Sequence, residues 1–148
     1  MVRIMITEIK EASEYIKERT SVSPEILIVL GSGFSSFVEA MDNCTTIDYK
    51  DIPHFPQPTV EGHSGKLVFG IVKDRPVMVM AGRFHLYEGH APQRVAFPIY
   101  VAKFLGVKGV IVTNAAGGDK SGVQTRRSDS GAGCYKLHVQ KPSEGPER

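Results

Sequence analysis

The chain contains only two cysteines among its 148 residues, Cys44 and Cys134. The distance between them in the sequence matches neither a metal-ligand spacing nor a redox motif, so the cysteines indicate no zinc site and no thiol chemistry. A protein with so few cysteines needs no oxidising compartment. We therefore expect it to work in the reducing cytoplasm.

Long apolar runs and a charge excess of one sign are missing as well. No stretch of 18 consecutive apolar residues occurs, and no basic segment followed by an apolar one opens the chain, so we expect neither membrane insertion nor secretion. The 18 Lys and Arg residues nearly balance the 16 Asp and Glu residues, which leaves a net charge of +2. Because no cluster of Lys or Arg falls on one predicted face, we expect no nucleic-acid partner.

What is present is an alternation of helix and strand patterns. Apolar residues at helical spacing predict an amphipathic helix over residues 7–19 and a second helix over 93–105, with a kink or a late start at Pro98. Three prolines within residues 51–59 predict an extended loop that crosses the surface. Apolar runs predict strands near residues 26–30, 67–73, 76–81 and 108–113. This order predicts an α/β fold with a mixed, twisted sheet flanked by helices.

The most informative polar residues, Arg83 and His85, directly follow the predicted strand 76–81. Residues two apart on an extended backbone project from the same face, about 7 Å apart at their α-carbons. Such a pair can converge on one tetrahedral anion, and the guanidinium supplies a planar, charged fork. Two polar groups immediately after a buried strand would otherwise need unrelated partners, so we interpret them as a phosphate-binding pair.

Three further segments carry weaker signals. In the turn Gly31-Ser32-Gly33, after the first strand, glycines allow backbone N–H groups to approach a ligand and Ser32 adds a hydroxyl. His63 lies in a loop bounded by glycines, and small residues over 114–118 leave room for a planar ligand against the backbone. Taken singly, the turn is better explained as an ordinary strand-end turn and His63 as an ordinary loop histidine. Their order along one chain is what favours a common site.

At this point the sequence closely resembles the trimeric, low-molecular-mass class of purine nucleoside phosphorylases. The resemblance covers about residues 21–118, and 5′-methylthioadenosine phosphorylases differ from this chain around the arginine. One local departure is Ser35, where the family usually has another glycine. The matching motifs are Leu-Gly-Ser-Gly-Phe at 30–34, Ile-Pro-His-Phe-Pro at 52–56, Glu-Gly-His-Ser-Gly at 61–65, Ala-Gly-Arg-Phe-His-Leu-Tyr-Glu-Gly at 81–89 and Thr-Asn-Ala-Ala-Gly-Gly at 113–118.

This resemblance implies a nucleoside phosphorylase fold and the phosphorolysis of purine ribonucleosides or 2′-deoxyribonucleosides. It implies inorganic phosphate as co-substrate, neither a metal nor an organic cofactor, and a homotrimer for the full-length protein. His85 and Glu88 are the expected catalytic residues. The expected phosphate-binding residues are Ser32, His63, Arg83, His85 and the backbone of Ala115. The expected nucleoside contacts are Tyr87 at the sugar together with Asn114, Ala115 and Ala116. We assign no role to His54 and His90.

After Gly118 the pattern of the sequence changes. Residues 119–133 show neither a strand period nor a helix period, and residues 119–148 carry 6 Lys and Arg against 4 Asp and Glu, whereas residues 1–118 carry 12 of each. The segment resembles nothing that the family carries there. We therefore expect residues 1–118 to be the N-terminal part of a phosphorylase domain and 119–148 to be an unrelated, disordered tail. A frameshift or a wrong splice is our hypothesis for the switch.

Two alternatives stay open. One is an inactive, phosphate-binding fragment of the same family, because the family residues that read the purine belong to a second half that cannot be mapped here. The other is a Rossmann-type dinucleotide-binding domain with Gly31-Ser32-Gly33 as its fingerprint. Its spacing is unfavourable, since Ser36 stands where the third glycine or an alanine is needed for close packing of helix and strand.

Overall fold

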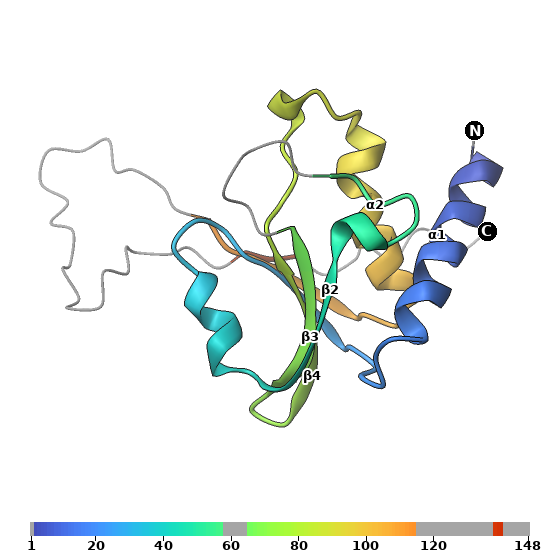
Figure 1. Cartoon of the computed structure of the whole chain (residues 1–148). Coiled ribbons are helices and arrows are strands. Elements are labelled where there is room, and N and C mark those ends of the chain that lie inside the picture. Colours follow the sequence, from blue (N-terminus) through green and yellow to red (C-terminus); the bar gives the residue numbers. More distant parts are fainter. Residues whose placement is uncertain (1, 58–64, 115–137, 141–148) are drawn as a thin grey trace, which may run out of the picture.

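The structure is a computed structural model of the chain, and it describes residues 2–57, 65–114 and 138–140. A mixed sheet runs through the molecule in the strand order β2-β3-β4-β1-β5-β6, with α1 and α2 side by side on one of its faces (Figure 1). The helices are α1 (Val2–Lys17) and α2 (Pro92–Phe104), with short 3-10 helices η1 (Ser35–Ala40), η2 (Tyr49–Asp51) and η3 (Leu86–Glu88). The strands are β1 (Ile26–Val29), β2 (Asp42–Asp48), β3 (Lys66–Val72), β4 (Arg75–Ala81), β5 (Gly109–Val112) and β6 (His138–Gln140).

The central strand is β1, which pairs in parallel with two neighbours. Ile26 lies opposite Val77 of β4 on one side and opposite Gly109 of β5 on the other. On the far side of β4, β3 and β2 continue the sheet as an antiparallel meander. Because β1, β4 and β5 run in the same direction, their carboxyl ends meet at one edge of the sheet, where α/β proteins hold their ligands.

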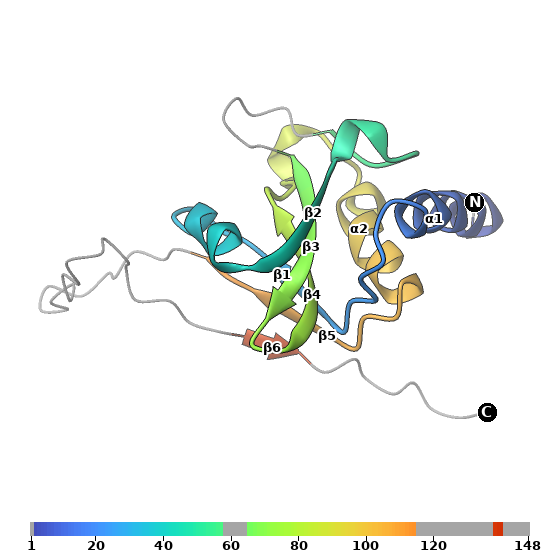
Figure 2. The same ribbon diagram turned by 60° about the horizontal axis from the view of Figure 1, so that its bottom comes forward.

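Both faces of the sheet are covered, and both are apolar. Residues of α1 and α2 pack with alternate strand residues such as Leu27 and Val29, while Ile28 and Leu30 face the other way, toward η1. Figure 2 shows this arrangement, with the two long helices on one side of the strands and η1 on the other. Burial of both faces explains why β1 is a continuous apolar run rather than an alternating one.

The mixed, helix-flanked sheet confirms the predicted fold class. Both predicted helices are present, and α2 begins at Pro92 and continues through Pro98. Of the two expectations at Pro98, the late start is therefore wrong, and the kink stays a prediction. Pro98 costs one helical hydrogen bond, and the burial of its neighbours Phe97 and Val101 against the sheet outweighs that loss. The proline loop is also less exposed than expected, because it buries Ile52 and Phe55 in the core.

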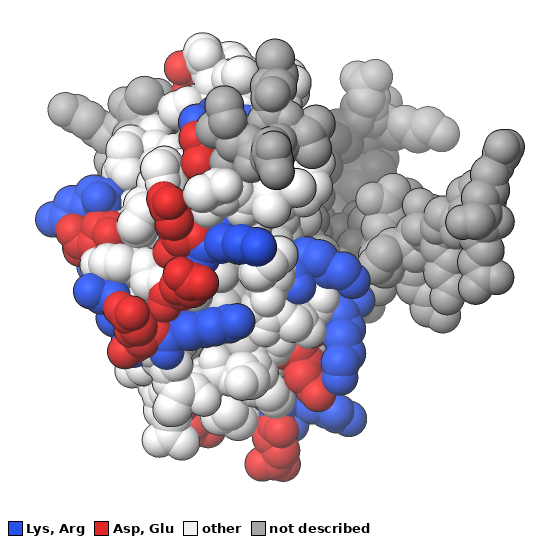
Figure 3. Space-filling view, turned by 90° about the vertical axis from the view of Figure 1, so that its right-hand side faces the viewer, with Lys and Arg blue, Asp and Glu red and all other residues white. Residues whose placement is uncertain are grey.

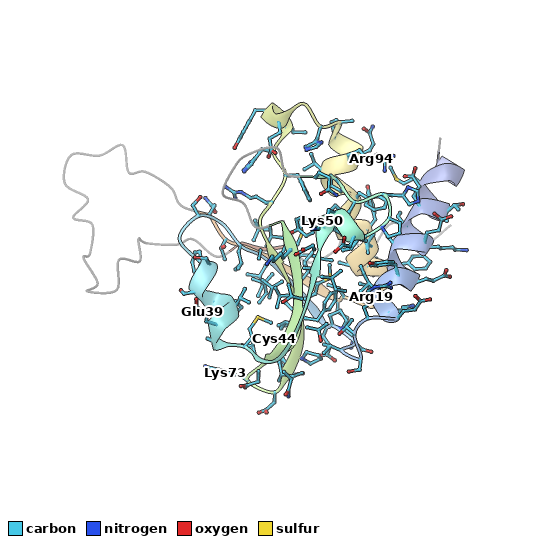
Figure 4. The ribbon with its side chains drawn as sticks, viewed as in Figure 1. Arg19, Glu39, Cys44, Lys50, Lys73 and Arg94 are labelled. Carbon is cyan, nitrogen blue, oxygen red and sulfur yellow. The ribbon has the colours of Figure 1, made fainter. Side chains whose placement is uncertain are left out.

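Strand β2 escaped the sequence analysis. Its sequence, Asp-Asn-Cys-Thr-Thr-Ile-Asp, is polar because β2 lies at the edge of the sheet and exposes most of its residues. Cys44 lies on this strand with its thiol 3.4 Å from the carbonyl oxygen of Met41, near the end of η1 (Figure 4). Polar edge strands carry little hydrophobic periodicity, so the pattern gives no signal for them.

Strand β6 lies in the segment that we expected to be a disordered tail. It pairs antiparallel with β5, with His138 opposite Val112 and Gln140 opposite Val110. For these three residues the structure differs from the expectation; the rest of segment 119–148 lies outside the described residues. The physical reason is that the far edge of β5 presents unpaired N–H and C=O groups, which a short extended segment can satisfy.

The two long helices are joined at the surface by charged groups. The guanidinium of Arg94 on α2 reaches the carboxylate of Glu8 on α1 with two nitrogens, at 2.9 and 3.2 Å, and Figure 4 shows Arg94 beside α1. His54 of the proline loop contacts Glu11 at 2.6 Å. On the face that carries α1, acidic and basic side chains are interspersed (Figure 3).

None of the helices within the described residues has the length and apolar character that crossing a membrane requires.

Candidate functional site

The carboxyl ends of the three parallel strands are tied together by backbone hydrogen bonds. The N–H of Leu30, just after β1, donates to the carbonyl of Met80 in β4 at 3.1 Å, and the N–H of Thr113, just after β5, donates to Val29 at 3.0 Å. The turn Gly31-Ser32-Gly33 therefore starts between the segment that carries Arg83 and the segment that carries Asn114. Three regions that are far apart in the sequence reach one edge of the sheet.

Thr113 links the first turn to the last strand. Its hydroxyl accepts a hydrogen bond from the N–H of Gly31 at 2.8 Å and donates to the carbonyl of Val29 at 3.2 Å, and the residue is buried. A Cβ placed on Gly31 would lie 2.4 Å from the carbonyl oxygen of Thr113. The sequence analysis attributed this glycine to the approach of a ligand, but the structure shows that close approach of the neighbouring backbone already requires it.

Replacing Thr113 by valine should lower the free energy of unfolding by about 1 to 3 kcal/mol, because the N–H of Gly31 would lose its buried acceptor while the side chain keeps its shape. Replacement by serine retains the hydroxyl and should cost less than the valine change. Denaturant unfolding of the two variants measures the difference. If valine and serine destabilise equally, the hydroxyl is not what holds the turn.

The arginine segment brings its polar side chains together as predicted. Nε of Arg83 donates to Nε2 of His85 at 3.3 Å, and the imidazole stacks on the ring of Tyr87 with centroids 4.7 Å apart and planes 14° apart. The two terminal nitrogens of Arg83 have no partner among the described residues. Arg83 and His85 are half-buried, whereas Tyr87 is 77% exposed. A cationic fork and an imidazole therefore lie side by side, half-buried, at this edge.

Glu88 positions His85 through the backbone. Its carboxylate accepts a hydrogen bond from the N–H of His85 at 2.8 Å, and its own N–H donates to the carbonyl of His85 at 3.1 Å. These reciprocal bonds close η3, which ends at Gly89 in the left-handed conformation with φ 84°. The carboxylate of Glu88 therefore fixes the backbone position from which the imidazole of His85 projects.

The remaining predicted residues divide into two groups. Ser32 and Asn114 are exposed, at the ends of the neighbouring strands β1 and β5. His63, Ala115 and Ala116 lie outside the described residues. Within the described ranges, no group of three or more His, Cys, Asp and Glu side chains is placed to hold a metal ion. Two hollows, of about 280 and 210 Å³, are lined by residues other than the predicted site residues.

A buried aromatic residue that the sequence analysis did not single out supports the arginine segment from below. The hydroxyl of Tyr49 donates to the carbonyl of Gly82 at 2.8 Å, and its ring lies 5.1 Å from that of Phe84 and 5.4 Å from that of Phe55. Phe55 in turn meets Phe97 of α2 edge to face at 5.8 Å. Tyr49 and its hydrogen-bond partner Gly82 are 33 residues apart in the sequence, so no short-range sequence pattern indicates this contact.

Comparison with known proteins gives one consistent result. Residues 25–127 match the family model described as the phosphorylase superfamily, and the match runs past Gly118. Purine nucleoside phosphorylase 1 of Geobacillus stearothermophilus is 48% identical over 112 residues, which cover 76% of this chain and 41% of that protein. The purine nucleoside phosphorylase of Bos taurus is 42% identical over 109 residues, 74% of this chain and 38% of that protein.

Solved structures agree with the sequence matches. Isoform 2 of the Schistosoma mansoni purine nucleoside phosphorylase, in complex with cytosine and ribose-1-phosphate, superimposes with a TM-score of 0.74 at 41% identity. That match covers 80% of this chain and 42% of the other. A second Schistosoma mansoni purine nucleoside phosphorylase, in complex with acetate, gives a TM-score of 0.72 at 49% identity, over 76% and 42% of the two chains. The chain therefore spans about two fifths of the length of the relatives that it matches.

Proposed function

The chain belongs to the phosphorylase superfamily, and from that membership we propose that it is the N-terminal part of a purine nucleoside phosphorylase and holds the phosphate side of the active site. The observation that carries the proposal is the pair formed by Arg83 and His85 at the carboxyl end of β4. The relatives matched across this region are purine nucleoside phosphorylases. We further propose a cytoplasmic protein whose full-length form is a homotrimer.

In the proposed reaction, an oxygen of inorganic phosphate attacks the anomeric carbon of the pentose. The glycosidic C–N bond breaks, its electron pair leaves with the purine, and the products are pentose 1-phosphate and, after protonation, the free base. The anomeric carbon becomes cationic in the transition state, so a polyanion held beside it stabilises that state electrostatically. The reaction needs no metal and no organic cofactor.

The geometry supports a role for each described phosphate residue. The Arg83–His85 bond uses Nε of the arginine, and its two terminal nitrogens, which have no partner among the described residues, can serve as a bidentate donor for phosphate. Glu88 fixes the backbone of His85 and thereby keeps the imidazole beside the guanidinium. Ser32 would add a hydroxyl from the first turn, and His63 and the backbone of Ala115 would complete the set.

The nucleoside side is less complete in this chain. We propose that Tyr87, exposed beside His85, contacts the sugar, and that residues 114–116 line the nucleoside. The family groups that stabilise the departing purine belong to the second half, which this chain does not match. A site that holds the nucleophile without stabilising the leaving group loses most of its rate, because that interaction strengthens in the transition state.

The deciding experiment combines two measurements on the purified 148-residue chain. Phosphate-dependent cleavage of inosine tests catalysis, and titration of inorganic phosphate and of hypoxanthine, followed by calorimetry, tests the two halves of the site. We expect measurable phosphate binding with little or no cleavage, and weaker hypoxanthine binding. Efficient cleavage would show that this chain is a complete enzyme. Tight hypoxanthine binding without phosphate binding would reverse the assignment of the two halves.

A further inference from the structure

Tyr49, the first residue of η2, contacts both neighbours of Arg83. Its side chain is completely buried, its hydroxyl donates to the carbonyl oxygen of Gly82 at 2.8 Å, and its ring packs on Phe84. Gly82 precedes the arginine and Phe84 follows it. Arg83 therefore lies between two residues, Gly82 and Phe84, that are both in contact with Tyr49.

The backbone of Tyr49 reaches a second segment of the proposed site. Its N–H donates to the carbonyl of Gly65 at 2.7 Å. Gly65, with φ 51°, is the first described residue after the loop that contains His63. One residue thus anchors the start of the arginine segment and the end of the histidine loop.

The peptide between Gly82 and Arg83 needs such an external contact. Gly82 adopts φ 114°, a region that only glycine enters readily, and a residue without a Cβ has several other conformations of similar energy. The bond from Tyr49 selects one of them by fixing the direction of the Gly82 carbonyl. Burial raises the pKa of the Tyr49 phenol, so the hydroxyl keeps the proton that it donates.

We propose that Tyr49 is a positioning residue for phosphate binding: its hydroxyl orients the Gly82–Arg83 peptide and thereby directs the guanidinium toward the anion. The inference rests on the proposed function, because phosphate is the ligand in question. The aromatic packing of Tyr49 with Phe55 and Phe84 keeps the ring in place, so the hydroxyl can be removed without removing its scaffold.

The test is Tyr49→Phe in the full 148-residue chain, titrated with inorganic phosphate. The dissociation constant should rise about 3- to 10-fold, since one aligning hydrogen bond is lost while the charge of Arg83 stays. Tyr15→Phe removes a phenol hydroxyl from α1 and should leave phosphate affinity unchanged.

The mobility of the Arg83 amide gives a second readout that does not depend on phosphate. The N–H of Arg83 belongs to the same peptide unit as the carbonyl of Gly82, so its NMR order parameter should be lower in Tyr49→Phe than in the parent chain, because the peptide loses the bond that orients it. An unchanged order parameter together with an unchanged phosphate affinity would overturn the inference alone. If the parent chain binds no phosphate, the proposed function fails, and the order parameter still decides whether Tyr49 orients this peptide.

Discussion

Replacing Arg83 by alanine should weaken the binding of inorganic phosphate about 10- to 100-fold, which corresponds to about 1.5 to 3 kcal/mol of binding free energy. The substitution removes a charge and both terminal nitrogens that have no partner among the described residues, and it leaves His85 without its neighbour at 3.3 Å. Arg83→Lys should recover only part of the affinity, because the charge returns without the planar fork. Calorimetric titration of phosphate measures all three proteins.

The matched control is Arg75→Ala. Arg75 lies at the opposite end of the same strand, β4, where its guanidinium is exposed and contacts Glu25 at 3.4 Å. The control removes the same charge from the chain, so it separates the local fork from the general attraction of a cationic protein for an anion. An equal loss of phosphate affinity in both variants would mean that net charge, not a site at Arg83, binds the phosphate.

Replacing Gly31 by alanine should lower the free energy of unfolding by about 3 kcal/mol or more, at the upper end of the range for overpacking. The new Cβ would lie 2.4 Å from the carbonyl oxygen of Thr113 and 3.0 Å from the Cα of Asn114. Both neighbours are backbone atoms of the segment that follows β5, so neither can turn aside as a flexible side chain would. The strands β1 and β5 would have to separate at their carboxyl ends.

Gly109→Ala is the control for this prediction. Gly109 begins β5, at the other end of the same strand pair, and a Cβ built there meets nothing within 4 Å. Its replacement should change the stability by less than about 1 kcal/mol. Urea unfolding followed by circular dichroism compares the two variants. Equal stability of Gly31→Ala and the parent chain would show that the strand ends are looser than the 2.4 Å approach implies.

The sequence predicted well those features that depend on residues close to one another in the chain. Apolar runs marked β1, β3, β4 and β5, and the spacing of Arg83 and His85 predicted that their side chains lie close together, as residues two apart on an extended backbone do. The roles of the active-site residues stay predictions, which the phosphate titrations test. The family resemblance, carried by five short motifs, agrees with the superfamily match over residues 25–127.

What the sequence could not predict depends on contacts between distant segments. Thr113 meets Gly31 across 82 residues, and Tyr49 meets Gly82 across 33. In the sequence, Thr113 reads as the end of a strand and Tyr49 as an ordinary core aromatic. Nothing in the sequence therefore indicates that either residue holds the segments of the site in place. The polar edge strand β2 was missed for the opposite reason, because solvent exposure removes the periodicity that would reveal it.

The central place of β1 in the sheet has a consequence for how the protein is made. Ile26 is synthesised before both of its partners, Val77 and Gly109, which follow it by 51 and 83 residues. Contacts between such distant segments close slowly, because the intervening chain must lose its freedom before the pairing stabilises it. A nascent chain that ends before Val112 therefore has no assembled strand ends to hold phosphate, and one apolar edge of β1 remains open to pairing with a foreign strand.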